Sequence, residues 1–157
     1  MISIRQATIS DISELKKLYK DTVLTINRKD YSAEEVEDWA SCGEDVTHWH
    51  ILFSEQHYIV AENDAREIIG FASVNDVGYM HTMFVHKDFQ NQGIATALYS
   101  TIEKHCKKTG AERITSEVSI TARPFFERMG FVVNEEQKRK ANHLSLTNYK
   151  MSKDIDK

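Results

Sequence analysis

The spacing of hydrophobic positions switches several times along the chain between the period of a strand and the period of a helix. Alternating or short continuous apolar segments are typical of strands, and apolar positions three and four residues apart are typical of amphipathic helices. The strand pattern occurs at 2–7, 57–61, 68–74, 79–85, 113–118, 131–133 and 143–151. The helix pattern occurs at 11–27, 32–43, 45–53, 93–109 and 122–129.

Polar residues and glycine mark the ends of the predicted helices. Asp11 with Glu14, and Ser32 with Glu35, have the spacing of a capping box, in which two side chains bond the free amides of a first helical turn. Gly110 follows the longest predicted helix, where a glycine commonly ends the helix in a left-handed conformation.

The order of the elements predicts the fold class. Three strands follow one another between residues 57 and 85, and the last two strands are also adjacent. A regular alternation of strand and helix would give a parallel, doubly wound sheet, whereas runs of strands give a mixed sheet. We therefore expect an α/β (α+β) fold, with a mixed, mostly antiparallel sheet of about seven strands and helices on both faces.

Length, composition and charge fit one packed domain, expected over 1–157. The 157 residues lie within the usual range of about 100–200 for one domain. Hydrophobic residues make up 41% of the chain, more than is typical of a disordered chain. The 20 basic and 24 acidic residues give a net charge of −4, which argues against nucleic acid as a partner because phosphate binding needs a basic surface.

We expect a cytoplasmic protein without a membrane partner. No apolar run approaches the roughly 20 residues that cross a bilayer, and the first residues lack the apolar core of a secretory signal. The two cysteines, Cys42 and Cys106, are too few for a disulfide framework. A monomer and a homodimer are both compatible with this composition.

The segment 83–98 carries the most informative chemistry. A hydrophobic strand ends, a polar loop containing Gly93 follows, and a helix begins. The first amides of a helix lack partners inside the helix, and together with the helix dipole they favour an anion. The loop has neither the Gly-Lys-Ser/Thr of a Walker loop nor the glycines of a dinucleotide fingerprint. By itself the segment fits either an anion site or a plain strand-to-helix turn.

Gln90-x-x-Gly93-x-Ala95 resembles the Gln/Arg-x-x-Gly-x-Gly/Ala signature of the GNAT superfamily of N-acetyltransferases. The segment 120–131 contains Ala-x-x-x-Phe-x-x-x-Gly-Phe, similar to the family's Ala-x-x-x-Tyr-x-x-x-Gly-Phe, and it further resembles a YafP-like bacterial subgroup. The order of the elements also resembles that of the family. The resemblance spans nearly the whole chain and is weakest over 28–56.

The resemblance implies an N-acetyltransferase that moves an acetyl group directly from acetyl-CoA to a small-molecule or peptide amine in a ternary complex, with no metal. It implies strands that splay to admit the cofactor, and a Val85 amide that polarises the thioester carbonyl. The implied cofactor-binding residues are Met83, Phe84, Val85, Gln90, Asn91, Gln92, Gly93, Ile94, Ala95, Thr96 and Phe126.

Two features depart from the family's pattern. Asn91 and Gln92 stand where many members have Arg or Lys, so backbone amides and the helix dipole must do more of the phosphate binding. Phe126 stands where many members have a tyrosine that protonates the leaving thiolate, and a phenyl ring cannot donate a proton. The second departure leaves open a catalytically weak acyl-CoA-binding or regulatory module. A scaffold without any ligand is disfavoured by the loop composition.

The amine must lose a proton before it attacks, because a free alkyl ammonium has a pKa of about 10.4. His81 titrates near neutrality and is the first candidate for the base, with Glu117 as the rival on the next strand. Strand alternation places His81 on the same face as Met83 and Val85. The alternative for His81 is a surface or hydrogen-bonded structural histidine.

Tyr149 is the candidate for the acid that Phe126 cannot supply. The resemblance implies that the last strand lies beside the strand carrying Glu117, where a tyrosine could reach the leaving sulfur. The alternative for Tyr149 is an ordinary strand aromatic that packs against a helix.

The segment 31–49 combines acidic and aromatic residues, and in the resembling family the corresponding region walls the acceptor site. Carboxylates and rings together would suit a cationic amine, and the alternative is a solvated helix face with two core tryptophans. His48 and His50, two apart on a helix, point in different directions, which argues against a metal site. The residues in question are Tyr31, Glu34, Glu35, Glu37, Asp38, Trp39, Glu44, Asp45 and Trp49.

Overall fold

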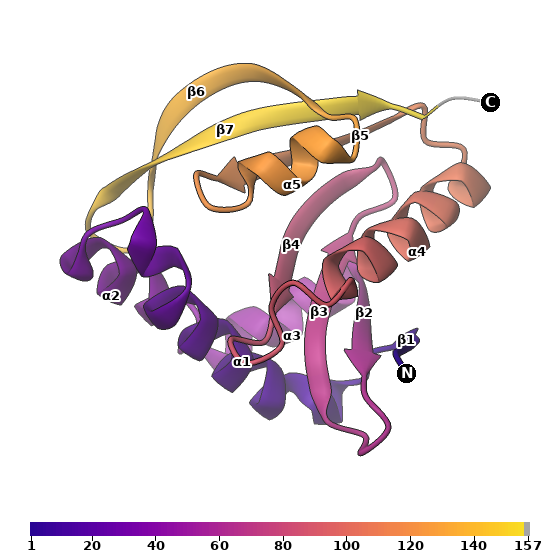
Figure 1. The fold of residues 1–157 in the computed structure, drawn as a ribbon, viewed down its shortest axis with the longest axis horizontal. Coiled ribbons are helices and arrows are strands. Elements are labelled where there is room, and N and C mark those ends of the chain that lie inside the picture. The colour runs from indigo at the N-terminus through magenta and orange to yellow at the C-terminus, as the bar shows by residue number, and fades with distance from the viewer. Residues whose placement is uncertain (156–157) are drawn as a thin grey trace.

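Strands of the computed structural model form one sheet, and helices cover both of its faces (Figure 1). The structure describes residues 1–155, so the last two residues of the expected domain, 156 and 157, lie outside the described part. The strands are β1 (Ser3–Gln6), β2 (His57–Glu62), β3 (Ile68–Val74), β4 (Tyr79–Val85), β5 (Arg113–Ser119), β6 (Val132–Lys140) and β7 (Ser145–Asp154). The helices are α1 (Ile12–Thr25), α2 (Ala33–Ser41), α3 (Val46–Glu55), α4 (Ile94–Thr109) and α5 (Arg123–Arg128).

The seven strands within residues 1–155 follow the order β1-β2-β3-β4-β5-β7-β6. Every neighbouring pair is antiparallel except β4 and β5, which run parallel. The chain reaches β5 from β4 through α4, as parallel neighbours require a long crossover. The predicted mixed, mostly antiparallel sheet with helices on both faces is confirmed.

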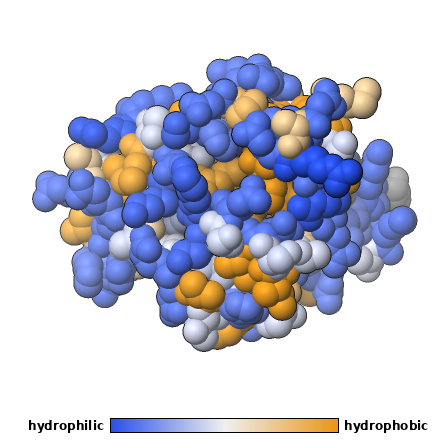
Figure 2. All heavy atoms as spheres, turned by 90° about the horizontal axis from the view of Figure 1, so that it is seen from below, coloured by the Kyte–Doolittle hydropathy of each residue, from blue (hydrophilic) through white to orange (hydrophobic). Residues whose placement is uncertain are grey.

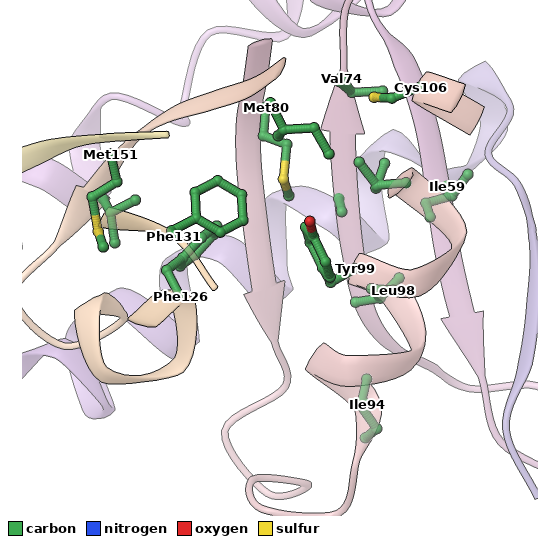
Figure 3. Packing of buried hydrophobic residues seen from close by; sticks show 14 of the residues in the cluster. Ile59, Val74, Met80, Ile94, Leu98, Tyr99, Cys106, Phe126, Phe131 and Met151 are labelled. Atoms are coloured by element: carbon green, nitrogen blue, oxygen red, sulfur yellow. The ribbon is translucent and has the colours of Figure 1, made fainter. Parts of the chain in front are cut away.

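Two hydrophobic clusters hold the helices on the sheet. One cluster joins the sheet to α4 and α5, and the other joins it to α1, α2 and α3 (Figures 1 and 3). Gly70 on β3 lets α4 come close, because a Cβ at this position would lie 2.9 Å from Ile94 and 3.1 Å from Leu98. The close contact fixes the first turn of α4 against the sheet.

The two predicted capping boxes have different outcomes. At α2, the Ser32 hydroxyl accepts the Glu35 amide at 3.1 Å and the Glu35 carboxylate accepts the Ser32 amide at 2.9 Å, as predicted. The pairing of Asp11 with Glu14 is wrong. Instead, the Asp11 carboxylate accepts the Thr8 amide at 2.8 Å and also binds Arg5. The contact with Thr8 caps a 3₁₀ turn, Ile9–Asp11, that directly precedes α1.

The length of β6 also differs from the prediction, which placed a strand at 131–133. The strand extends over Val132–Lys140, and most of its residues are exposed. An edge strand with little burial on either face has no alternation of apolar and polar residues, so its sequence does not differ from that of a loop.

On the face seen in Figure 2, hydrophilic side chains predominate and apolar side chains appear in separate patches. None of the helices described within residues 1–155 combines the length and apolar character needed to cross a membrane.

Two histidines stack where α4 meets β2. The rings of His57 and His105 lie 4.2 Å apart between centroids and are almost parallel, at 9°. Burial and the neighbouring His105 lower the pKa of His57 below 6.5, and Asp76 acts weakly in the opposite direction. The folded protein therefore resists protonation of His57 more than the unfolded chain does.

We expect this stack to make folding sensitive to mild acid. Since the unfolded state takes up a proton that the folded state excludes, the free energy of unfolding should fall as the pH drops from about 7.5 to about 5.5. Urea unfolding of His57→Gln should show a shallower fall than the parent, and His50→Gln, on the exposed side of α3, controls for the loss of one histidine. Equal slopes in the parent and His57→Gln would contradict the prediction.

Candidate active site between the separating strands

The parallel strands β4 and β5 pair at two positions and then separate. Tyr79 pairs with Thr115 and Met80 with Ser116, and the Ser116 hydroxyl donates to the Met80 carbonyl at 2.9 Å. Beyond these two residue pairs lies a cavity of about 1000 Å³. It is lined by residues of both strands, of the first turn of α4, of α1, α2, α3 and α5, and of the ends of β6 and β7. The predicted splay of the strands is confirmed.

Backbone amides of β4 point into the gap. The His86 amide donates to the Ile69 carbonyl at 2.9 Å, which identifies these two opposed residues as a hydrogen-bonded pair. Bonded and unbonded pairs alternate along an antiparallel ladder, so Val85 and Met83 direct their amides away from β3, toward β5. The Val85 carbonyl, on the same side, accepts a hydrogen bond from the side-chain Nε2 of Gln90 at 2.8 Å. The Val85 and Met83 amides are therefore available to a ligand in the gap.

A bulge near the middle of β4 overturns the predicted faces of this strand. Val74 of β3 opposes Met80 and Ser73 opposes Thr82, so His81 is an extra residue without an opposite partner. Met80 consequently packs in the same cluster as Met83 and Val85, whereas strict alternation placed His81 there. An inserted residue reverses the alternation, because a strand repeats every two residues.

His81 instead faces the side of the cavity lined by α3 and β6. Its ring lies 6.3 Å from that of Tyr79, and water reaches its side chain inside the cavity. The surrounding cavity walls lower the pKa of His81 below 6.5, His48 and Arg139 lower the pKa further, and Glu117 opposes them. A histidine that is neutral at pH 7 can accept a proton from an amine.

Glu117 lies in the same part of the cavity, already paired. Its carboxylate binds the Nη1 of Arg139, and 21% of the Glu117 side chain is exposed against 60% of the Arg139 side chain. The structure thus places the two candidate bases, His81 and Glu117, in one part of the cavity, with Arg139 beside Glu117. Arg139 was not predicted because it lies in a segment without strand periodicity, although the run 138–140 is entirely basic.

The loop before α4 has a geometry suited to an anion. Gly93 adopts a left-handed conformation with φ of +81° and has nothing within 4 Å of the position of a Cβ, so the approach to the first amides of α4 is open. The side-chain amide of Gln90 donates hydrogen bonds to the backbone carbonyls of Val85 and His86. This side chain therefore stabilises the end of β4 and is not free to serve a ligand alone.

Most of the predicted cofactor-binding residues line the cavity. Gln92 is exposed and is not among the lining residues. Those on the lining are Met83, Phe84, Val85, Gln90, Asn91, Gly93, Ile94, Ala95, Thr96 and Phe126.

Phe126 and Tyr149 occupy different environments. Phe126 reaches the cavity wall from the core, where its ring meets Phe131 edge-on at 5.0 Å (Figure 3). Tyr149, on β7, lies opposite Val118 of β5, and the Arg123 guanidinium covers its ring at 4.6 Å from the ring centroid. Tyr149 is not among the residues that line the cavity. The structure does not bring Tyr149 to His81.

The acidic residues of 31–49 lie outside the cavity lining, whereas the aromatic residues Tyr31, Trp39 and Trp49 are part of it. Asp38 has a structural partner, since its carboxylate accepts the amides of residues 142–144 at 2.8–3.0 Å. These amides lower the pKa of Asp38 below 3.8. Trp49 is buried in the core. An acidic wall around a cationic acceptor is therefore not found among the described residues.

This sheet, with a ligand-sized gap beside the start of a helix, matches a known family. Residues 27–153, most of the chain, match the profile of the acetyltransferase (GNAT) domain. The chain belongs to this family and is an N-acetyltransferase by class.

Individual relatives agree with the family assignment. The chain is 28% identical over 150 residues to the uncharacterized N-acetyltransferase YafP of Escherichia coli (strain K12), covering 96% of this chain and 94% of the relative. A GCN5-related N-acetyltransferase from Rhodopseudomonas palustris, whose crystal structure is described as "Aminotransferase, Class-II", superimposes with a TM-score of 0.93 at 26% identity, covering 97% of this chain and 94% of that chain. The PaiA N-acetyltransferase of Thermoplasma acidophilum, in complex with coenzyme A, shares the fold with a TM-score of 0.77 at 19% identity, over 98% of this chain and 99% of that chain.

Asp38 should be needed to hold the turn between β6 and β7 against α2. In Asp38→Ala the three amides lose their acceptor, so trypsin should cut after Lys140 faster than in the parent, as followed by mass spectrometry of the fragments. Glu37→Ala, a neighbouring exposed carboxylate on α2, is the matched control and should leave the rate unchanged. Equal cleavage rates in all three proteins would show that Asp38 does not secure the turn.

Proposed function

We propose that the protein transfers an acetyl group from acetyl-CoA to the nitrogen of a small-molecule or peptide amine, with both substrates bound at once. The observation that carries the proposal is the gap between β4 and β5, where the free amides of Met83 and Val85 lie beside the open start of α4. An extended pantetheine arm can bond these amides as a neighbouring strand would, and the first turn of α4 suits the pyrophosphate.

The residues of the chain fit the needs of the reaction. Acetyl-CoA supplies an electrophilic carbonyl and a thiolate leaving group. The Val85 amide donates to the carbonyl oxygen as negative charge builds on it. His81 accepts a proton from the amine, and Glu117 is the rival base, although its carboxylate is already bound to Arg139. The nitrogen then forms the amide bond as the carbon–sulfur bond breaks.

The source of the proton for the thiolate differs from the family's pattern, because Phe126 has none to give. The prediction that Tyr149 supplies it stays a prediction. The position of Tyr149 behind Arg123, outside the cavity lining, favours water as the donor instead. If the protein bound acetyl-CoA but acetylated no amine, that result would support the alternative, a binding or regulatory module. The departure at Phe126 would then explain the lack of turnover.

Gly93→Glu should raise the dissociation constant for CoA at least about 100-fold in calorimetry, because the new carboxylate repels the phosphates from the first turn of α4. Gly110→Glu is a matched control at the other end of the helix. It has a similar left-handed φ of +85° and also has nothing within 4 Å of its Cβ position, so it carries similar backbone strain far from the site. Unchanged CoA binding in Gly93→Glu would remove the cofactor assignment.

His81→Ala should lower kcat by about 10²–10⁴-fold at neutral pH, the usual contribution of a general base. The loss should shrink above about pH 9, where more of the amine is already neutral. In the parent the rate should fall as the pH drops through the lowered pKa of His81, below 6.5, because the protonated ring cannot accept a proton. His50→Ala, on α3 outside the cavity lining, is the control, and full activity of His81→Ala at neutral pH would move the role to Glu117 or water.

A further inference from the structure

The charges that line the cavity are opposite in sign to the net charge of the chain. The chain as a whole carries −4, yet among the described lining residues Glu117 is the one carboxylate. The lining residues with a permanent positive charge are Lys29, Arg128, Arg139 and Lys140.

The polyanionic co-substrate does not account for all of these cations. Arg128 belongs to α5, whose lining residues adjoin the proposed pantetheine path, so a CoA phosphate can pair with it. Arg139 and Lys140 belong to β6, and Arg139 lies beside Glu117 and acts on the pKa of His81. This is the end of the cavity at which the acceptor nitrogen must meet the base.

Glu117 occupies only part of the hydrogen-bonding capacity of Arg139. Its Nη1 binds Glu117, whereas its Nε and Nη2 have no hydrogen-bond partner within residues 1–155, and 60% of its side chain is exposed. A guanidinium presents five donors in a flat fork that fits a carboxylate with two parallel bonds. The pairing also neutralises Glu117, which makes a purely cationic acceptor a poor fit.

An apolar wall completes this part of the cavity. The Trp39 ring is half-buried, meets Tyr31 edge-on at 5.5 Å and lies 6.4 Å from the ring of Phe84. All three residues line the cavity. The acceptor end therefore offers an apolar surface, a cation with free donors and a neutral histidine.

We propose that the acceptor is a free amino acid with an aromatic or aliphatic side chain. Its carboxylate binds Arg139 and Lys140, its side chain packs on Trp39, and its nitrogen points toward His81. This assignment rests on the proposed function, since it takes the same cavity as an acetyl-transfer site.

Matched acceptors that differ in the carboxylate alone test the assignment. L-phenylalanine, phenylalaninamide and phenethylamine share the ring and the amine, as do L-leucine, leucinamide and isoamylamine. With release of the CoA thiol as the readout and mass spectrometry of the product, kcat/KM for the amino acid should exceed that of either analogue by at least about tenfold, as expected for a charge-assisted hydrogen bond. The amide analogues have the more readily deprotonated amine, so this preference would run against intrinsic reactivity.

Arg139→Gln should raise the KM of the amino acid by about 10- to 100-fold and reverse the preference toward phenethylamine, because the freed Glu117 then attracts an ammonium group. Arg139→Lys keeps the positive charge but lacks the flat guanidinium, so its KM for the amino acid should lie between that of the parent and that of Arg139→Gln. Lys138→Gln removes the same charge from a neighbouring position of β6 outside the cavity lining and should leave every KM unchanged.

The outcomes separate the two proposals. Equal or better turnover of the amines without a carboxylate, no acetylation of any amino acid, or an unchanged preference in Arg139→Gln would overturn the acceptor assignment. Calorimetry with CoA alone tests the proposed function independently, because CoA binding does not require the acceptor. Absence of CoA binding would overturn the proposed function, and the acceptor assignment with it.

Discussion

The site depends on one constraint, which is that β4 and β5 pair at only two positions and then separate. Inside a folded protein, backbone groups that leave a ladder must find other partners, because an unpaired buried amide or carbonyl is costly. The chain supplies partners for one of these groups, as the Val85 carbonyl accepts both the Thr22 hydroxyl at 3.1 Å and the Gln90 amide. Within residues 1–155, it supplies none for the Val85 amide. In the proposed complex, the pantetheine arm takes the place of a strand at this point of the sheet.

Contacts elsewhere in the fold hold β4 and β5 apart and position the helix start and the side chains that border the gap. Close packing of α4 on Gly70 fixes the helix start beside the end of β4, and the Ser116–Met80 bond sets the point at which the strands part. On the other side, Asp38 ties α2 to the turn between β6 and β7, so that Trp39 and Arg139 border one space. Residues far apart in the sequence thus meet in one cavity through contacts that are themselves ordinary.

Much of this could be predicted from the sequence, wherever burial leaves a periodic pattern. The helices, the three-strand run and the loop at Gly93 follow from apolar spacing and glycine, and the splay followed from family resemblance. The bulge at His81 could not be predicted, because an extra residue in a strand leaves the local composition unchanged while it reverses the faces around it. Arg139 was missed for a related reason, since an exposed edge strand has no periodicity. His81 and Arg139 both line the cavity, outside the packed core, where the hydrophobic pattern does not record the direction of a side chain.

The exposure of β6 has a consequence for solubility. As the last strand of the sheet it presents a nine-residue edge whose outward backbone groups could pair with another chain and nucleate aggregation. Its sequence blocks this, since Glu135, Glu136, Lys138, Arg139 and Lys140 place charges of both signs along the edge. Arg139 and Lys140, which line the cavity, are thus also part of the barrier to edge-to-edge association. A substitution that removes either charge weakens this barrier and also changes the charge of the cavity lining.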